Sequence, residues 1–226
     1  MGLGLGSAPA RPAGGGALRR VRITLFGTPD SVYTRIIRLI LEFKNVGHDF
    51  VMADIFDDGG LPDDYERRHP FRRIPCIEID GMVVYETDAI AHYLEALLPE
   101  PSLIPADART AMRMRQIMRV VDNYAYRPLV WGIYVPQWGR DGTMPAQETL
   151  TEAETALRAL QELVGEGGVG LSPNLAWCYL APVLAVADSV AAGSELIDRV
   201  PALKEWWHCV RSASAMVRTR SSESRY

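Results

Sequence analysis

Cysteine is scarce in this chain of 226 residues, which contains only Cys76, Cys178 and Cys209. An odd number of widely spaced cysteines argues against a disulfide framework and against a metal site. The pattern instead favours a reducing compartment, in which we expect three buried and unreactive thiols and no metal.

An excess of basic residues is also lacking, since 24 Lys and Arg stand against 28 Asp and Glu, which gives a net charge of -4. Charges of both signs are interspersed, so the chain has no basic field suited to nucleic acid. No apolar run in the sequence reaches the length needed to span a bilayer. These absences predict a cytoplasmic protein without nucleic-acid or membrane partners.

What the sequence does contain is enough apolar material, 48% of the residues, for one large or two small domains with real cores. Its ends differ from the rest. Residues 1–20 are rich in Gly, Ala and Pro and lack acidic residues, which predicts a disordered tail, with an organelle-targeting segment as the second interpretation. The polar residues 218–226 are expected to be frayed.

The order of elements from residue 21 to residue 98 follows from periodicity and turn signals. Residues 74–79 and 82–85 read as two strands joined by Asp80-Gly81, a two-residue hairpin signal. The other predicted elements are strands at 21–26 and 48–55, helices at 31–44 and 88–98, and a short irregular helix within 59–68. Together they predict a βαβαββα domain.

Only helical patterns follow the proline-rich linker at 99–107. The predicted helices cover 108–138, 146–164, 175–192 and 201–213. The fold class is therefore α/β plus all-α, with a domain at 21–98 and a helical domain at 108–217.

The segment from His69 to Leu94 concentrates polar residues at the joints between strand, hairpin and helix. Thr87 is predicted to be the N-cap of the helix that begins at Asp88, where free backbone N–H groups and the helix dipole favour a carboxylate. Glu86 and Thr87 therefore predict a small-anion site. Simple helix capping explains this pair alone equally well.

Three segments of the chain resemble the glutathione transferase family. They are LFGTPDSVYTRIIRLIL at 25–41, IPCIEIDGMVVYETDAIAHYL at 74–94 and LAPVLAVADSV at 180–190. The resemblance implies a thioredoxin-like domain joined to an all-helical domain, usually in a homodimer. It also implies that glutathione is the co-substrate and that its thiol is added to an electrophile.

The resemblance also implies how glutathione is held. Pro75 matches a cis-proline that exposes the backbone of Ile74 to the cysteinyl part of the tripeptide. Glu86 and Thr87 match an acid-hydroxyl pair that holds the γ-glutamyl carboxylate. Arg73 is expected to pair with the glycyl carboxylate.

Conjugation requires a thiolate, because a free thiol with a pKa of roughly 8.5 is only slightly ionised at neutral pH. Ser31 matches the family position for a catalytic Ser or Cys, four residues before Arg35, and the helix dipole supports an anion there. Thr28, Tyr33 and Thr34 are its rivals. A second interpretation is that Ser31 only caps the helix.

The chain departs from the family pattern at His69, where Asn is common, at Arg72, where Gly is common, and at Trp177, where Asp completes a capping box. Arg72 is expected either to bind glutathione or to point to solvent. Asn174 is the predicted N-cap of the helix that contains Trp177.

The predicted acceptor site lies in the aromatic segment 123–138. Tyr124, Trp131, Tyr134 and Trp138 recur at helical spacing, and Tyr126 and Trp131 are the expected lining residues. Tyr33 is a further candidate for lining the electrophile pocket. Interdomain core is an equally good interpretation of this aromatic stripe.

The resulting hypothesis is a glutathione transferase that conjugates hydrophobic electrophiles. A glutathione-dependent isomerase or dehalogenase uses the same activated thiol. A non-catalytic glutathione- or hydrophobe-binding protein is the alternative from a different functional class.

Overall fold

The computed structural model describes residues 21–138 and 143–221. The N-terminal tail predicted at 1–20 lies outside these residues, as does most of the predicted C-terminal tail. Arg218, where that C-terminal tail was expected to begin, is the last residue of helix α9.

The N-terminal part has the predicted thioredoxin-like order of elements. These are β1 (Ile23–Gly27), α1 (Val32–Phe43), β2 (Asp49–Met52), the short 3-10 helix η1 (Tyr65–Arg67), β3 (Cys76–Ile79), β4 (Met82–Tyr85) and α2 (Thr87–Leu97). The sheet order is β2-β1-β3-β4, with β1 and β2 parallel and the other pairs antiparallel. Asp80 and Gly81 both have positive φ angles, 49° and 88°, as the hairpin signal predicts.

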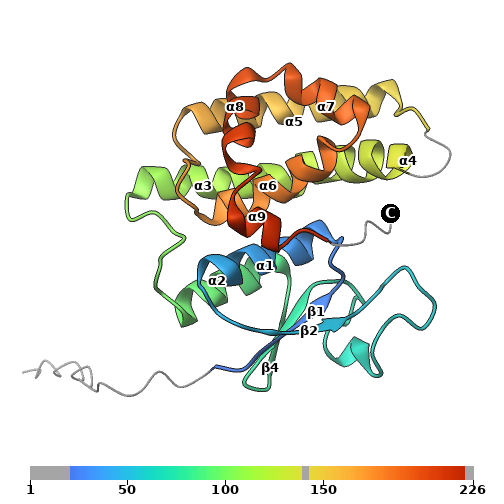
Figure 1. Ribbon diagram of the computed structural model, residues 1–226, viewed down its shortest axis with the longest axis vertical. Helices are drawn as coiled ribbons and strands as arrows, with labels where there is room; N and C mark the ends of the chain where they lie inside the picture. Colours follow the sequence, from blue (N-terminus) through green and yellow to red (C-terminus); the bar gives the residue numbers. More distant parts are fainter. Residues whose placement is uncertain (1–20, 139–142, 222–226) are drawn as a thin grey trace, which may run out of the picture.

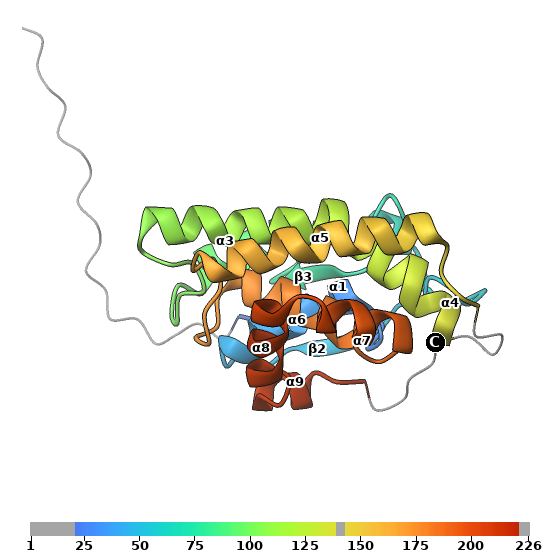
Figure 2. The ribbon, with the colours of Figure 1, turned by 90° about the horizontal axis from the view of Figure 1, so that it is seen from above.

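The C-terminal part is helical, as predicted. Its elements are α3 (Ala108–Val120), the π-helical segments η2 (Val121–Ala125) and η3 (Arg127–Tyr134), α4 (Val135–Trp138), α5 (Gln147–Gly165), α6 (Leu175–Ala187), α7 (Ala191–Asp198), α8 (Pro201–Val210) and α9 (Ser214–Arg218). Helices α3 and α5 run side by side (Figure 2).

The two parts meet where α1 packs against α6, so that α1 and α2 lie between the sheet and the helices above it (Figure 1). Helix α6 is apolar all round, which is typical of a helix enclosed by others. Trp177 of this helix is buried edge-on against Phe43 of α1, with ring centroids 5.0 Å apart. Asn174 caps α6 as predicted, since its Oδ1 accepts from the Trp177 N–H at 3.0 Å.

The prediction of a single helix at 175–192 is wrong, because α6 ends at Ala187, with Asp188 as its C-cap, and α7 begins at Ala191. The Asp188 carboxylate accepts from the indole N–H of Trp207 at 2.9 Å and from the Ser194 hydroxyl at 3.1 Å. Gly193 lies so close to the Ala187 carbonyl that a Cβ there would overlap it. These contacts turn the chain back at Asp188.

A buried ion pair joins the α/β part to the linker that follows it. The Lys44 ammonium at the end of α1 lies 2.5 Å from the Glu95 carboxylate of α2, and both side chains are almost fully buried. Lys44 also donates to the Pro101 carbonyl at 2.7 Å, and Glu95 accepts from the Leu103 N–H. The linker is thereby fixed against α1 and α2.

Two of the three expected buried thiols are found, at Cys76 and Cys178, whereas Cys209 is exposed. All three are free. Among the residues with described positions, no helix combines the length and apolar character needed to traverse a membrane.

Candidate active site

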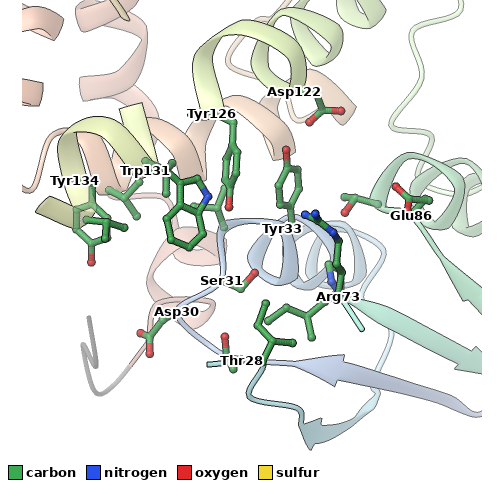
Figure 3. A pocket seen from close by; sticks show the side chains of 18 of the residues that line it. Thr28, Asp30, Ser31, Tyr33, Arg73, Glu86, Asp122, Tyr126, Trp131 and Tyr134 are labelled. Atoms are coloured by element: carbon green, nitrogen blue, oxygen red, sulfur yellow. The ribbon is translucent and has the colours of Figure 1, made fainter. Parts of the chain in front are cut away.

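A cavity of about 610 Å³ lies between the α/β part and the helices, a volume typical of small-molecule sites (Figure 3). The residues that line it fall into two sets. Those between Thr28 and Asp88 form what we call the α/β wall, and those between Arg119 and Val186 form the helical wall. All nine residues that the sequence assigns to the site line this cavity: Ser31, Tyr33, Arg73, Ile74, Pro75, Glu86, Thr87, Tyr126 and Trp131.

Ser31 stands at the N-terminus of α1, directly after the turn that follows β1. Its Oγ accepts from the Thr34 N–H at 3.2 Å, so the capping interpretation is correct. A serine hydroxyl has one proton and two acceptor lone pairs, so this bond leaves the proton free. Because Ser31 also lines the cavity, capping and donation to a bound anion are compatible.

The three rivals of Ser31 differ in where their hydroxyls lie. Thr28 lines the cavity below Ser31 in Figure 3, and its buried Oγ1 has no hydrogen-bond partner within residues 21–138 and 143–221. Thr34 is fully buried and does not line the cavity, because its side chain packs against the Cα of Gly27. The hydroxyl of Tyr33 points toward Asp122, away from Ser31 (Figure 3).

The Ile74-Pro75 peptide bond is cis, as the resemblance implies, and both residues line the cavity. The loop before it is held by the Tyr65 hydroxyl, which donates to the Arg73 carbonyl at 2.9 Å. The Arg73 side chain reaches into the cavity (Figure 3).

Arg72 is exposed and does not line this cavity; it borders a second, acidic hollow together with Asp54 and Glu66. Its φ of 49° lies in the left-handed region, which glycine adopts without steric cost. That backbone angle accounts physically for the glycine that the family pattern has at this position.

The prediction that Thr87 caps α2 is wrong by one residue. The N-cap is Glu86, which has a φ of 70° and makes no side-chain capping bond, and Thr87 is the first helical residue. The strained Glu86 backbone turns the chain so that both residues line the cavity at the helix N-terminus. The free N–H groups of this end therefore remain available to an anion.

His69, a departure from the family pattern, is buried against the Tyr85 ring, 4.9 Å away between centroids. Its Nδ1 has no hydrogen-bond partner among the described residues. Burial lowers the pKa of His69, although the Glu86 carboxylate opposes this shift. The imidazole is therefore neutral at physiological pH and adds no positive charge to the cavity.

A charged cluster that sequence reasoning missed joins the two walls. Arg119 lies 3.2 Å from the Asp88 carboxylate of α2 and 2.5 Å from the Asp122 carboxylate of η2. Burial raises the pKa of Asp122 to about 6, while Arg119 opposes the shift. Burial also raises the pKa of Tyr33, and the nearby Asp122 charge adds to this effect.

Aromatic side chains dominate the helical wall. Tyr126 packs on Tyr33 with ring centroids 4.5 Å apart, and Trp131 packs on Phe56 of the α/β wall at 5.8 Å. Tyr134 also lines the cavity, together with the apolar residues Val130, Val135 and Val186. This end of the cavity suits an apolar ligand.

Tyr124 was predicted to share one helical face with Trp131 and Tyr134, and this is wrong: it is 64% exposed and does not line the cavity. The segment is π-helical, with i to i+5 hydrogen bonds in place of the α-helical i to i+4 pattern. The wider turn brings Tyr126 and Trp131, five residues apart, to the cavity together. The side chain of Trp138 lies outside what the structure describes.

The missed residues Asp122 and Arg119 carried one local signal, their i,i+3 spacing of opposite charges on a helix. Such pairs are common on exposed helix faces, so the signal does not point to a site. Their proximity to Tyr33 and Asp88 is set only by tertiary packing.

Comparisons with known proteins agree with this architecture. Residues 25–102 match the family model described as "Glutathione S-transferase, N-terminal domain". A maleylacetoacetate isomerase of Rattus norvegicus is 30% identical over 156 residues, which cover 67% of this chain and 72% of that protein.

Solved structures show the same fold. Glutathione transferase F7 from Populus trichocarpa superposes with a TM-score of 0.73 at 20% identity, covering 87% of this chain and 97% of that one. A maleylacetoacetate isomerase from Anaeromyxobacter dehalogenans gives a TM-score of 0.66 at 19% identity, covering 89% and 92%. The chain therefore belongs to the glutathione S-transferase family.

Proposed function

We propose that this glutathione-dependent enzyme activates the glutathione thiol with Ser31 and transfers the resulting thiolate to an apolar electrophile. The observation that carries the proposal is the double role open to the Ser31 hydroxyl. Its oxygen caps α1 by accepting from the Thr34 N–H, and its proton is left free for donation into the cavity that Ser31 lines. A thiolate at this point receives that proton as a hydrogen bond and also meets the positive end of the α1 dipole.

Glutathione would extend along the α/β wall from Ser31 to the N-terminus of α2. The Ile74 backbone is placed to pair with the cysteinyl part, and Arg73 is suited to the glycyl carboxylate. The γ-glutamyl carboxylate then lies at Glu86 and Thr87, where the free N–H groups of α2 supply donors. Positioning of this kind accounts for much of the rate enhancement in bimolecular reactions.

The acceptor would lie against the helical wall, beside Tyr126 and Trp131. Four carboxylates line the described part of the cavity (Asp30, Glu86, Asp88 and Asp122) against two cations. One cation, Arg119, is paired with two of these carboxylates, and the other, Arg73, is assigned to glutathione. This balance favours an uncharged electrophile over an anionic one.

Isomerisation is the second candidate, because relatives such as the Rattus norvegicus protein are named maleylacetoacetate isomerase. Both reactions use the same thiolate at Ser31. They differ in whether the sulfur stays on the product, so product analysis separates them.

We also propose a cytoplasmic homodimer that acts in detoxification. Phe71 and Tyr85 expose 68% and 38% of their surface next to His69, which lines the cavity. The Phe71 and Tyr85 rings lie 6.5 Å apart, so these two side chains form an apolar patch that a second copy of the chain would cover.

The test is conjugation of glutathione to 4-nitrobenzyl chloride by the wild type and by Ser31→Ala and Ser31→Thr. Removal of one hydrogen bond to a developing or bound anion lowers kcat by roughly 100- to 1000-fold, which is the loss expected for Ser31→Ala. Ser31→Thr keeps the hydroxyl and the cap, so it should retain most of the activity. A wild type that binds glutathione but conjugates nothing would support the non-catalytic binding protein instead.

A further inference from the structure

The sheet has two edges, and they differ in what surrounds them. Strand β4 is one edge, and its last residue, Tyr85, belongs to the patch that we assign to a second copy of the chain. Strand β2 is the other edge, and in the part of the chain that the structure describes it pairs only with β1. Figure 2 shows β2 on the same side of the molecule as α9, opposite α3 and α5. The β2 edge is therefore separate from the surface proposed for the homodimer.

The outer edge of β2 presents backbone groups that β1 does not use. The Ala53 N–H donates to the Gly27 carbonyl of β1 at 3.0 Å, and successive residues of a strand turn their backbone groups to alternate sides. The N–H and C=O groups of Phe50 and Met52 therefore point away from β1. Their side chains are 36% and 51% exposed, so this edge is apolar and open to solvent. Such an edge is a template for pairing with another extended chain.

Arginines without a carboxylate partner border this edge. Arg38 of α1 lies over the Phe50 ring, 5.9 Å from its centroid, and donates to the Thr219 carbonyl at 3.0 Å. Arg35, one turn earlier on α1, donates to the Met216 carbonyl at 2.9 Å. Because these acceptors are neutral, no carboxylate among the described residues neutralises either guanidinium.

The other charges around Arg38 leave this excess of positive charge in place. Burial lowers the pKa of Arg35 to about 10, and the nearby charges of Arg220 and Arg38 add to the shift. Arg220 is exposed and has no ion pair within residues 21–138 and 143–221. The Glu42 carboxylate of α1 is already paired with Arg218, at 2.6 Å. The border of β2 is thus basic in a protein whose net charge is -4.

We propose that the β2 edge is a docking site for an extended acidic segment of a partner protein, which adds to the sheet as a further strand. Backbone hydrogen bonds to Phe50 and Met52 would hold this segment, and carboxylates on alternate residues would face the arginines of α1 and α9. Asp49, the first residue of β2, offsets only one of the unpaired guanidinium charges. This inference goes beyond the proposed function and does not depend on it.

Charge disfavours a second copy of the chain as the occupant of this edge. A twofold pairing of β2 with β2 would bring the same surface of both copies together. Arg38 and Arg220 of one copy would then lie near the same arginines of the other, and like charges across paired strands are destabilising. An acidic segment meets no such repulsion.

The test uses the full chain and an acetylated, amidated octapeptide in which Glu and Val alternate. The matched control is the same peptide with Lys in place of Glu. Calorimetric titration at low ionic strength should show that the acidic peptide binds at least about tenfold more tightly than the basic one. Hydrogen exchange followed by NMR should show that the bound acidic peptide slows exchange of the Phe50 and Met52 amides at least about tenfold.

Three variants separate strand addition from attraction between charges. Met52→Pro removes an outward N–H and leaves the ladder to β1 intact, so it should weaken binding of the acidic peptide about tenfold. Met52→Ala keeps that N–H and should change the affinity by less than about threefold. Arg220→Gln removes an exposed charge and should weaken binding about three- to fivefold. Thermal unfolding checks that each variant is folded.

Selective binding of the acidic peptide, with protection of the Phe50 and Met52 amides and a loss in Met52→Pro, supports the proposal. Equal binding of the two peptides, no binding, or binding that leaves these amides unprotected would overturn it. Protection that grows with protein concentration in the absence of peptide would instead assign the edge to a second copy. Binding that appears only in a chain shortened to end at Ser221 would assign it to the protein's own last residues. None of these results bears on Ser31 or on the proposed function.

Discussion

The two walls of the cavity differ in what holds their functional groups in place. On the α/β wall, Ser31, Ile74 and Thr87 present a helix cap, a backbone segment and a helix N-terminus, all fixed by the course of the main chain. On the helical wall, Tyr126 and Trp131 present aromatic side chains whose direction depends on a π-helical segment. In the function proposed above, the wall defined by the backbone holds glutathione, and the wall defined by side chains holds the acceptor.

The largest expected effect comes from breaking the buried ion pair that fixes the linker against the α/β part. Lys44→Met leaves the Glu95 carboxylate buried without its ammonium partner, which should lower the free energy of unfolding by about 3–5 kcal/mol. Urea denaturation measures this loss. The double variant Lys44→Met with Glu95→Gln should recover a large part of the lost free energy of unfolding. The neutral side-chain amide introduced at position 95 still accepts from the Leu103 N–H through its oxygen. A loss below about 1 kcal/mol in the single variant would mean that the pair is not a stabilising joint.

A smaller effect, on KM for the acceptor, tests whether the two walls bind separate ligands. Phe56→Ala removes the ring that packs on Trp131 and should raise KM for an aromatic acceptor about tenfold, with kcat nearly unchanged. KM for glutathione should not change. Phe50→Ala, on β2 and outside the cavity, is the control. An equal rise in both KM values would contradict the division into two walls.

The charged cluster between the walls predicts a pH dependence of stability. The folded-state pKa of Asp122, about 6, lies above its unfolded value near 3.8, so the unfolded chain releases this proton first. Stability from this group is therefore lost as the pH rises from 3.8 to 6 and stays constant above that range.

Asp122→Asn removes this dependence. At pH 7.5 the variant should gain stability of the order of 1 kcal/mol over the wild type, and the gain should vanish near pH 4. Thermal unfolding at the two pH values measures the difference. A variant less stable than the wild type at pH 7.5 would mean that the pairing of Asp122 with Arg119 outweighs its burial.

The smallest effect belongs to the loop before Pro75. Arg72→Gly relieves a left-handed backbone, which costs a non-glycine residue roughly 1–2 kcal/mol, and part of this gain is offset by the greater freedom of glycine in the unfolded chain. The expected net gain is about 0.5 kcal/mol in chemical denaturation. Arg72→Ala keeps the Cβ and should show no such gain. Activity should be unaffected, because Arg72 does not line the cavity.

The sequence predicts the α/β wall better than the helical wall, for a physical reason. The hairpin at Asp80 and Gly81 and the cap at Ser31 depend on the turn and capping chemistry of a few consecutive residues. Even there, the predicted N-cap, Thr87, lies one residue after the observed N-cap, Glu86. No residue type near Glu86 indicates that its φ angle is positive.

On the helical wall the assumption of α-helical periodicity fails. Tyr124 was placed with Trp131 because offsets of seven residues share a face in an α-helix, and the π-helical turn breaks that rule. The cluster of Asp88, Arg119 and Asp122 brings together residues from two parts of the chain. Contacts between distant parts of the chain depend on tertiary packing, which local sequence patterns do not predict.

The measurement that tests the central claim most directly is a pH titration of glutathione bound to the enzyme, followed by the ultraviolet absorbance of the thiolate. The wild type should show a thiol pKa well below the value of roughly 8.5 for a free thiol. Ser31→Ala should raise the pKa of the bound thiol most of the way back to that value. A bound thiol with an unshifted pKa, or a shift that persists in Ser31→Ala, would contradict the assignment of thiol activation to Ser31.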